Sequence, residues 1–230
     1  MIRYLQLPFH FDTHRMQEEV AAVTALWKLH FNQRDYQGNW SGIALRSPGG
    51  AMDNLFAEAF DKDVPFLDTP LLADCPYLRE VIAALDCTKT SIRLLKLSQE
   101  AVVREHTDAG LNFEQGEVRL HLPIVTHPMV DFYLDGDRLE MKAGDCWYIN
   151  ASLPHRLANP SSVDRVHLVI DCMVNDWVKD LFERDDLPVK SVKDMSAQQA
   201  LQRLEIIAAL RASNDPVRIR LADQMEAGTH

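Results

Sequence analysis

The sequence predicts a mainly β protein with flanking helices. The first observation is a series of short apolar segments between about residue 91 and residue 172, separated by turn-forming residues. Many short strands at this spacing are typical of a β-sandwich or a β-barrel. The second observation is that helical periodicity is confined to the regions before and after this series. We therefore expect a β-block with helices packed on its outside.

The first ninety residues mix helices and strands. Apolar residues recur at helical spacing after Asp12, and Asp12 or Thr13 can cap that helix. Pro76 stands where proline is favoured, in the first turn of a second helix. The long segment between them is either a lid over a site or an inert loop. The predicted elements are a helix over 12–29, a strand over 43–46, an irregular segment over 51–75 and a helix over 76–85.

Turn signals divide the β-block. Asp135-Gly136-Asp137 predicts a hairpin turn, because Asp-Gly is favoured at the centre of two-residue hairpins. A second turn is predicted at Ala143-Gly144-Asp145. The predicted strands cover 91–97, 100–106, 117–124, 130–134, 138–142, 145–150 and 164–172.

Helical periodicity returns after the β-block. We predict helices over 175–182, 195–212 and 217–225. The second has Ser196 as its expected cap and one apolar stripe of Leu201, Leu204, Ile207 and Leu210. This stripe suits packing on the β-block or pairing with a second copy in a homodimer. The chain, 1–230, is expected to be a single domain with N-terminal helices and strands (1–90), a β-core (91–172) and C-terminal helices (173–230).

Composition argues against several classes of function. The 230 residues carry a formal net charge of −10, which argues against binding the phosphate backbone of a nucleic acid. No apolar run is long enough to span a membrane and the N-terminus does not resemble a signal peptide, so we expect a cytoplasmic protein. The four cysteines are then expected to be reduced thiols, with disulfides or a zinc site as alternatives.

His106, Asp108 and His155 have the chemistry of a metal site. On a strand, His106 and Asp108 would face the same way, because side chains two residues apart share a face. Two histidines and one carboxylate on one side of an octahedral metal leave positions open, which suits Fe(II) enzymes that activate O₂. Each histidine taken alone could instead be an ordinary surface or hydrogen-bonded side chain.

Two predicted strands place an arginine and a histidine on one face. Arg165 and His167 alternate with apolar neighbours, and so do Arg119 and His121. A buried arginine must meet a carboxylate of the protein or of a ligand, because an unpaired buried charge is costly. The pattern therefore predicts a pocket for small anions. An internal salt bridge for Arg165, and a solvated face for Arg119 and His121, are the alternatives.

Several motifs between residues 93 and 172 occur in a specific order. They are His106-x-Asp108, Arg119-Leu120-His121-Leu122-Pro123, Gly144-Asp145-Cys146-Trp147-Tyr148, Pro154-His155, Asn159 and Arg165-Val166-His167-Leu168-Val169-x-Asp171. In these motifs the stretch resembles the aspartyl/asparaginyl β-hydroxylase family of Fe(II)/2-oxoglutarate-dependent dioxygenases. The resemblance implies a double-stranded β-helix, or jelly-roll, core of the cupin type.

The same resemblance implies the ligands of the site. It assigns Fe(II) to His106, Asp108 and His155, the distal carboxylate of the co-substrate 2-oxoglutarate to Arg165, and contacts with the co-substrate or the substrate to Arg119 and His121. The implied reaction uses O₂ to hydroxylate an unactivated C–H bond and releases succinate and CO₂.

Asp108 bears on the substrate. Eukaryotic family members that act on aspartyl and asparaginyl side chains lack this carboxylate, whereas bacterial members that hydroxylate free amino acids such as proline keep it. The resemblance thus implies a small amino-acid-like substrate. Arg46 is a further candidate for holding its carboxylate, unless it forms a surface ion pair. The alternative functions are a hydroxylase of aspartyl or asparaginyl residues in a peptide or protein, a non-oxidative metal cupin, and a metal-binding module.

Overall fold

The computed structural model describes residues 1–57, 61, 63–213 and 215–227. The chain divides into two compact units, one of Ile2–Ser191 and one of Val192–His230 together with Met1. The single domain expected over 1–230 stays a prediction, since cooperative unfolding of the whole chain would be needed to establish it.

The first unit contains two β-sheets. In spatial order the larger sheet holds β14 (Val189–Val192), β1 (Ile2–His10), β11 (Asp145–Ile149), β8 (Glu117–Val125), β13 (Arg165–Met173), β6 (Lys89–Leu97), β4 (Trp40–Pro48) and β2 (Lys28–Leu29), and β5 (Phe66–Asp68) also pairs with β4. The smaller sheet holds β10 (Asp137–Arg138), β9 (Asp131–Leu134), β12 (His155–Ala158), β7 (Val102–His106) and β3 (Tyr36–Gln37).

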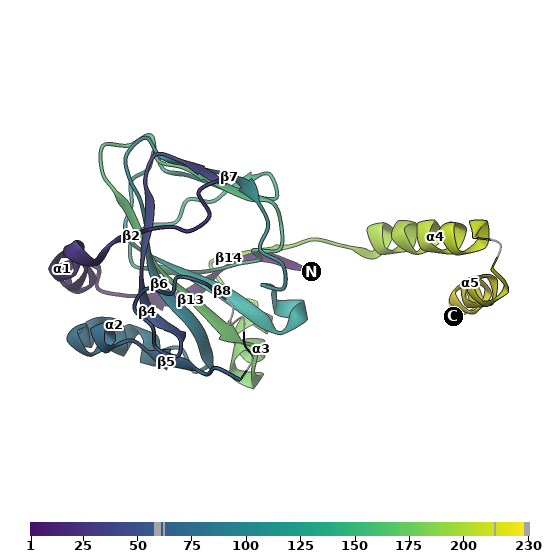
Figure 1. Cartoon of the computed structure of the whole chain (residues 1–230), viewed down its shortest axis with the longest axis horizontal. Coiled ribbons are helices and arrows are strands. Elements are labelled where there is room, and N and C mark those ends of the chain that lie inside the picture. Colours follow the sequence, from purple (N-terminus) through teal and green to yellow (C-terminus); the bar gives the residue numbers. More distant parts are fainter. Residues whose placement is uncertain (58–60, 62, 214, 228–230) are drawn as a thin grey trace. The chain divides into compact units, whose positions relative to one another are not determined.

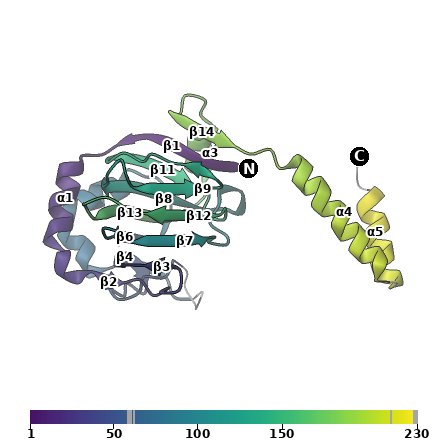
Figure 2. The ribbon, with the colours of Figure 1, turned by 90° about the horizontal axis from the view of Figure 1, so that it is seen from above.

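The two sheets form two facing layers (Figure 1). Figure 2 shows β9, β12 and β7 lying over β8, β13 and β6. The strands of each layer pair antiparallel, and strands distant in the sequence become neighbours, as in the pairing of β1 with β11. This is a jelly-roll arrangement, so the predicted mainly β fold with a double-stranded β-helix core is confirmed.

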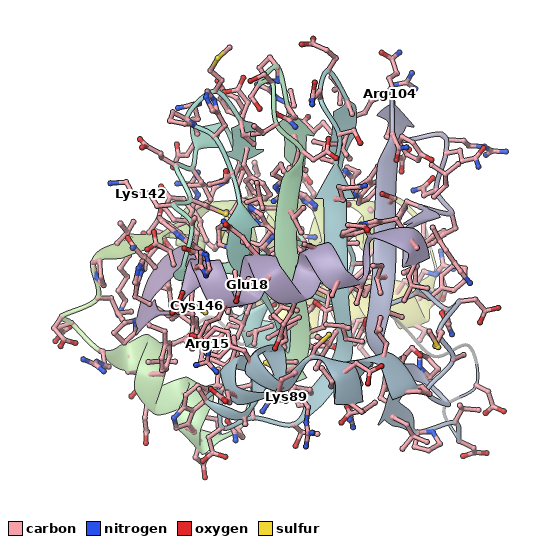
Figure 3. All side chains as sticks on the ribbon, turned by 90° about the vertical axis from the view of Figure 1, so that its left-hand side faces the viewer. Arg15, Glu18, Lys89, Arg104, Lys142 and Cys146 are labelled. Carbon is pink, nitrogen blue, oxygen red and sulfur yellow. The ribbon has the colours of Figure 1, made fainter. Side chains whose placement is uncertain are left out.

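Helices cover the outer face of the larger sheet. They are α1 (Thr13–Ala22) and α2 (Pro76–Ala83), with α3 (Asp176–Glu183) after the last long strand. Figure 3 shows α1, with Arg15 and Glu18 labelled, crossing the strands, and α2 beside it. One apolar core lies between this face and the helices, and a second one lies between the sheets. The space between the sheets therefore holds the remaining inward-facing side chains.

Alternation on β8 and β13 sorts their residues between these two spaces. Apolar residues of both strands join the core under the helices, and they include Val118, Leu120, Leu122, Val166, Leu168 and Ile170. The intervening arginines and histidines point to the inner face instead, because successive side chains of a strand alternate. The predicted faces of both strands are confirmed.

The first helix is shorter than predicted. Asp12 caps it, as expected, by accepting from the backbone N–H groups of His14 and Arg15. The helix ends at Ala22, and Lys28 and Leu29 pair with β4 instead of continuing it. Backbone pairing with a distant strand outweighs a helical apolar pattern here, since propensity is a weak signal. Strands β1, β12 and β14 were not predicted, because their partners lie far away in the sequence.

The second unit contains α4 (Ser196–Ala212) and α5 (Pro216–Ala227). The predicted cap of α4 is wrong: Met195 occupies the N-cap position, and Asp194 accepts from the backbone N–H of Ser196. The predicted stripe is also divided, because Ile207 is buried whereas Leu201 and Leu204 are about 60% exposed. Two helices alone cannot cover a wide apolar face, so only the part between them is buried.

Three smaller expectations can be compared with the described residues. Asp135 and Gly136 have positive φ and join Leu134 to Asp137, which confirms the hairpin turn. The four cysteines are free and buried, as predicted for reduced thiols. None of the helices in this part of the chain combines the length and the apolar character needed to cross a membrane.

Candidate metal and anion site

The predicted triad comes together between the two sheets. His106 ends β7 and His155 begins β12, and the two residues are cross-strand partners. Asp108 lies beyond the end of β7, where its backbone N–H donates to the carbonyl of Ala151 at 2.8 Å. One ligand atom from each triad residue lies within 4.8 Å of the others. The three residues meet as predicted, but a loop rather than strand alternation positions Asp108.

Both triad histidines have a fixed ring orientation. Nδ1 of His106 lies 2.8 Å from the carbonyl oxygen of Arg104, and Nδ1 of His155 lies 2.9 Å from that of Leu153. A carbonyl oxygen only accepts, so each Nδ1 carries the proton and each Nε2 keeps its lone pair. Metal-binding histidines are commonly held in this way. Burial, followed by the neighbouring His106, lowers the pKa of His155 to about 4, which keeps this ligand neutral near pH 7.

Asp108 is held in its ionised form. Burial would raise its pKa, but Arg119, His155 and His106 together hold the pKa below its usual value. Arg119 pairs with one carboxylate oxygen of Asp108. Its guanidinium also donates to both oxygens of Asp171, from Nε to Oδ1 at 2.7 Å and from Nη2 to Oδ2 at 3.0 Å. A neutral–neutral–anionic ligand set of this kind suits a divalent transition metal.

Arg165 is a buried cation without a carboxylate partner in the described part of the chain. It is 2% exposed, and its guanidinium donates to Nδ1 of His167 at 2.8 Å. Its Nε has no hydrogen-bond partner. Burial lowers the pKa of Arg165 to about 9, which still leaves the group charged at pH 7. The internal salt bridge considered as an alternative is not found among the described residues, so the charge remains available to an anionic ligand.

A cavity of about 390 Å³ joins the triad to Arg165. A second cavity, of about 280 Å³, shares Arg165 and Phe132 with it. The first is lined by the triad, by polar residues of β6, β8 and β13, and by apolar residues that include Phe31, Trp40, Phe56, Leu95, Leu111, Leu157 and Val169. A site with a few converging polar groups in an apolar wall is typical of small-molecule binding.

Arg119 and His121 also line this cavity. They are 7% and 6% exposed, so the solvated-face alternative is wrong. Nδ1 of His121 lies 3.4 Å from Nδ1 of His167, which already accepts from Arg165. The matching tautomer of His121 has its proton on Nδ1, and its buried Nε2 then carries a lone pair without a partner. Burial, followed by Arg165, lowers the pKa of His121 well below its usual value, so the ring is neutral.

Two charged residues of the site were not among the predicted site residues. Arg93 on β6 lines the cavity, and Asp171 on β13 joins Arg93 to Arg119. A signal was present, because Arg93 interrupts an otherwise apolar strand segment. Arg46 is not in the cavity; it forms an ion pair with Asp68 at 2.6 Å, which was the alternative given for it.

Fold and site define a jelly-roll protein with a candidate His-Asp-His metal site and a buried arginine facing the same cavity. The sequence model of the family described as aspartyl/asparaginyl beta-hydroxylase matches residues 11–174, and the chain belongs to this family.

Curated relatives include enzymes that act on proline. The chain is 27% identical over 188 residues to the L-proline cis-4-hydroxylase of Rhizobium meliloti (strain 1021), covering 80% of this chain and 65% of that protein. It is 28% identical over 139 residues to L-proline cis-3-hydroxylase 1 of a Streptomyces species, covering 58% and 47%. The chain thus spans about half to two thirds of the length of these relatives.

Solved structures show weaker likeness. A Pseudomonas putida prolyl-4-hydroxylase matches with a TM-score of 0.46 and 14% identity, covering 76% of this chain and 94% of that one. A 2OG-Fe(II) oxygenase family oxidoreductase from Burkholderia pseudomallei matches with a TM-score of 0.46 and 13% identity, covering 75% and 86%.

Proposed function

We propose that this chain is an Fe(II)/2-oxoglutarate-dependent dioxygenase that hydroxylates a C–H bond of a small amino-acid-like substrate. One observation carries the proposal. The same cavity is lined by the His-Asp-His triad and by Arg165, a buried cation that has no carboxylate partner among the described residues. Membership of the family and the two proline hydroxylases among its relatives support it.

The residues present fit the cofactor and the co-substrate. His106 and His155 offer Nε2 lone pairs and Asp108 offers a carboxylate, the donor set that suits Fe(II). Arg165 would hold the distal carboxylate of 2-oxoglutarate, because a planar guanidinium matches a carboxylate in bidentate fashion. When bound, Fe(II) and 2-oxoglutarate would supply, with O₂, the oxidising chemistry that hydroxylates the substrate and releases succinate and CO₂.

The remaining residues of the cavity orient these groups. Arg119 holds Asp108 in its ionised form and is itself anchored on Asp171. The resemblance to the family implies that His121 contacts the co-substrate or the substrate. In the tautomer described above its Nε2 accepts, so it would meet a donor group rather than a carboxylate oxygen. The apolar wall excludes water from the reacting C–H bond.

Anaerobic addition of Fe(II) and 2-oxoglutarate to the protein tests this proposal. We expect a weak visible charge-transfer band. Asp108→Ala should weaken iron binding at least tenfold, whereas Arg165→Met should leave iron binding intact and raise the 2-oxoglutarate concentration for half-maximal absorbance at least tenfold. Asp53→Ala, at an exposed position, is the matched control for Asp108. A folded protein that gives no band would exclude the dioxygenase.

The alternatives predict different results. A non-oxidative metal cupin or a metal-binding module would bind the metal without any effect of 2-oxoglutarate. A hydroxylase of aspartyl or asparaginyl residues would form the band but respond to a peptide rather than to a free amino acid. Three further expectations remain predictions: that the chain binds neither nucleic acid nor membranes, that it is cytoplasmic, and that it forms a homodimer.

A further inference from the structure

Arg93 is a buried cation in the cavity that neither the metal nor the co-substrate requires. It is 4% exposed. One guanidinium nitrogen donates to Oδ2 of Asp171 at 2.8 Å, and another donates to the carbonyl of Leu55 at 3.3 Å. Its Nε is buried without a partner. A guanidinium in this state has donor capacity left for a ligand in the cavity.

Asp171 cannot neutralise Arg93 by itself. The same carboxylate accepts from Arg119 through both of its oxygens. Among the described residues, the charged groups that line the cavity or pair with its arginines are three buried arginines, Arg93, Arg119 and Arg165, the buried Asp171 and the half-buried Asp108. Burial lowers the pKa values of His30 and His121, so both rings are neutral, and His106 and His155 each carry one proton on Nδ1 and keep a lone pair on Nε2. One positive charge is therefore left over.

The proposed cofactors do not remove this charge. A divalent metal adds two positive charges and the dianion of 2-oxoglutarate removes two, so the same excess of one remains. A low-dielectric cavity makes such an excess costly. A carboxylate beside Arg93 would form an ion pair with its guanidinium group.

Arg93 and Arg165 stand at separate places in the cavity. On β6, Leu97 pairs with Arg165 and Arg93 pairs with Val169. The two arginines are thus displaced by four residues along the sheet, or about 13 Å at a rise of 3.3 Å per residue. A carboxylate held at Arg165 would therefore leave the donors of Arg93 available to a second ligand group. The two guanidinium groups are therefore suited to two different carboxylates.

Part of the cavity wall is aromatic. The rings of His30 and Trp40 stack with centroids 3.6 Å apart, and those of Phe31 and Phe56 lie 4.1 Å apart. Burial, followed by Arg93, lowers the pKa of His30 to about 3, so its ring is uncharged. A ligand held by its carboxylate at Arg93 would thus rest its carbon skeleton against an uncharged surface.

We propose that Arg93 binds the carboxylate of the substrate, so that the substrate is a small molecule with a free carboxylate and an apolar body. This inference rests on the proposed function. It distinguishes free amino acids from residues inside a peptide, whose carbonyl carbon is part of an amide and carries no charge. Asp171 is then a positioning residue that holds Arg93 and Arg119 side by side.

The test compares carboxylates with their amides on the wild-type protein. Protein loaded anaerobically with Fe(II) and 2-oxoglutarate is titrated with L-proline and L-prolinamide, and then with the other common L-amino acids and their amides. Perturbation of the charge-transfer band reports binding. We expect at least one free amino acid to bind, and its amide to bind at least tenfold more weakly. Equal affinities, or binding of no free amino acid, would overturn the inference.

Two variants locate the effect at Arg93. Arg93→Gln should weaken binding of the free acid at least tenfold and abolish the preference over the amide, while Arg93→Lys should restore part of it. The 2-oxoglutarate titration should be unchanged in both, because Arg165 is retained. Arg46→Gln, at an arginine outside the cavity, should leave the preference intact. Retention of the full preference in Arg93→Gln contradicts the assignment.

Failure of the inference differs from failure of the proposed function. If wild-type protein gives no band with Fe(II) and 2-oxoglutarate, the dioxygenase assignment falls and takes the inference with it. If the band forms and 2-oxoglutarate binds normally, but acid and amide bind alike, only the role of Arg93 is wrong. If Arg93→Gln does not fold, the acid and amide comparison on Arg93→Lys and on wild-type protein still tests the inference.

Discussion

Asp171 is the residue on which the charged part of the cavity depends. It is fully buried on β13, and its two carboxylate oxygens pair with Arg93 and Arg119. Arg119 in turn pairs with Asp108 of the triad. A single carboxylate thus connects the candidate metal ligand to the proposed substrate arginine. Removal of its charge would leave Arg93 without a carboxylate partner among the described residues and Arg119 with Asp108 alone.

Asp171→Asn should therefore lower the free energy of unfolding by roughly 3–5 kcal/mol, the cost of breaking a buried ion pair. Asp186→Asn is the matched control, since Asp186 pairs with Arg184 at the exposed surface and should show no measurable change. Denaturant unfolding followed by circular dichroism measures both. A variant at Asp171 as stable as the control would mean that solvent already screens the cluster.

Among the elements, the turn before β11 and the hairpin turn each contain a glycine with a positive φ angle, but the two glycines have different surroundings. Gly144 has φ +89°, and a Cβ there would lie 2.7 Å from the carbonyl oxygen of Phe11 and from the ring of His10. Gly136, in the hairpin turn, has φ +87° with nothing within 4 Å. The Gly144 carbonyl also accepts from the backbone of Phe11. Glycine is required at position 144 both by the positive φ angle and by the nearby atoms of His10 and Phe11. At position 136 only the positive φ angle requires it.

Gly136→Ala should lower the free energy of unfolding by about 1 kcal/mol, the cost of a left-handed backbone for a residue with a Cβ. Gly144→Ala should cost roughly 1–3 kcal/mol more, because the backbone around the added methyl group must shift. Denaturant unfolding measures both losses of free energy, and the difference between them gives the contribution of the close contact alone. Equal losses would show that the chain near Phe11 moves freely to make room.

The chain divides into two compact units of unequal length. Both sheets and the candidate site lie in Ile2–Ser191, whereas Val192–His230 contributes the helices α4 and α5. None of the residues proposed for the site comes from the second unit. The first unit thus contains all that the proposed chemistry needs.

A chain ending at Asp194, which keeps β14, should unfold cooperatively and form the charge-transfer band with Fe(II) and 2-oxoglutarate. Its thermal midpoint should lie within about 4 °C of the full chain, as expected for a change of roughly 1 kcal/mol in a domain of this size. Calorimetry of both chains measures this. A much lower midpoint, or loss of cooperativity, would favour the single domain over 1–230.

Buried histidines make the stability of the metal-free protein depend on pH. Burial lowers the pKa of His30 to about 3 and the pKa values of His121 and His167 well below their usual value. The unfolded chain therefore binds more protons than the folded one below about pH 6.5. Stability should be greatest above that pH and fall by roughly 2 kcal/mol per buried histidine between pH 7 and pH 5.

Denaturant unfolding at pH 7, 6 and 5 checks this expectation. His167→Gln should reduce the dependence by the contribution of one histidine, while His14→Gln, at an exposed position, should leave it unchanged. A flat profile for wild-type protein would show that the buried rings take up protons without unfolding.

The sequence by itself determined which residues could do the chemistry. Alternation along β8 and β13 placed Arg119, His121 and Arg165 on an inner face, because that period follows from the strand backbone alone. The residue types at His106, Asp108 and His155 indicated a metal site for the same local reason.

Only the tertiary structure decided what these residues meet. Arg46 and Arg93 both stand in apolar strands, yet one pairs with a surface aspartate and the other is buried in the cavity. The end of α1 and the strands β1, β12 and β14 likewise depended on distant partners. Burial and pairing are set by contacts between residues far apart in the chain, and no local pattern contains them.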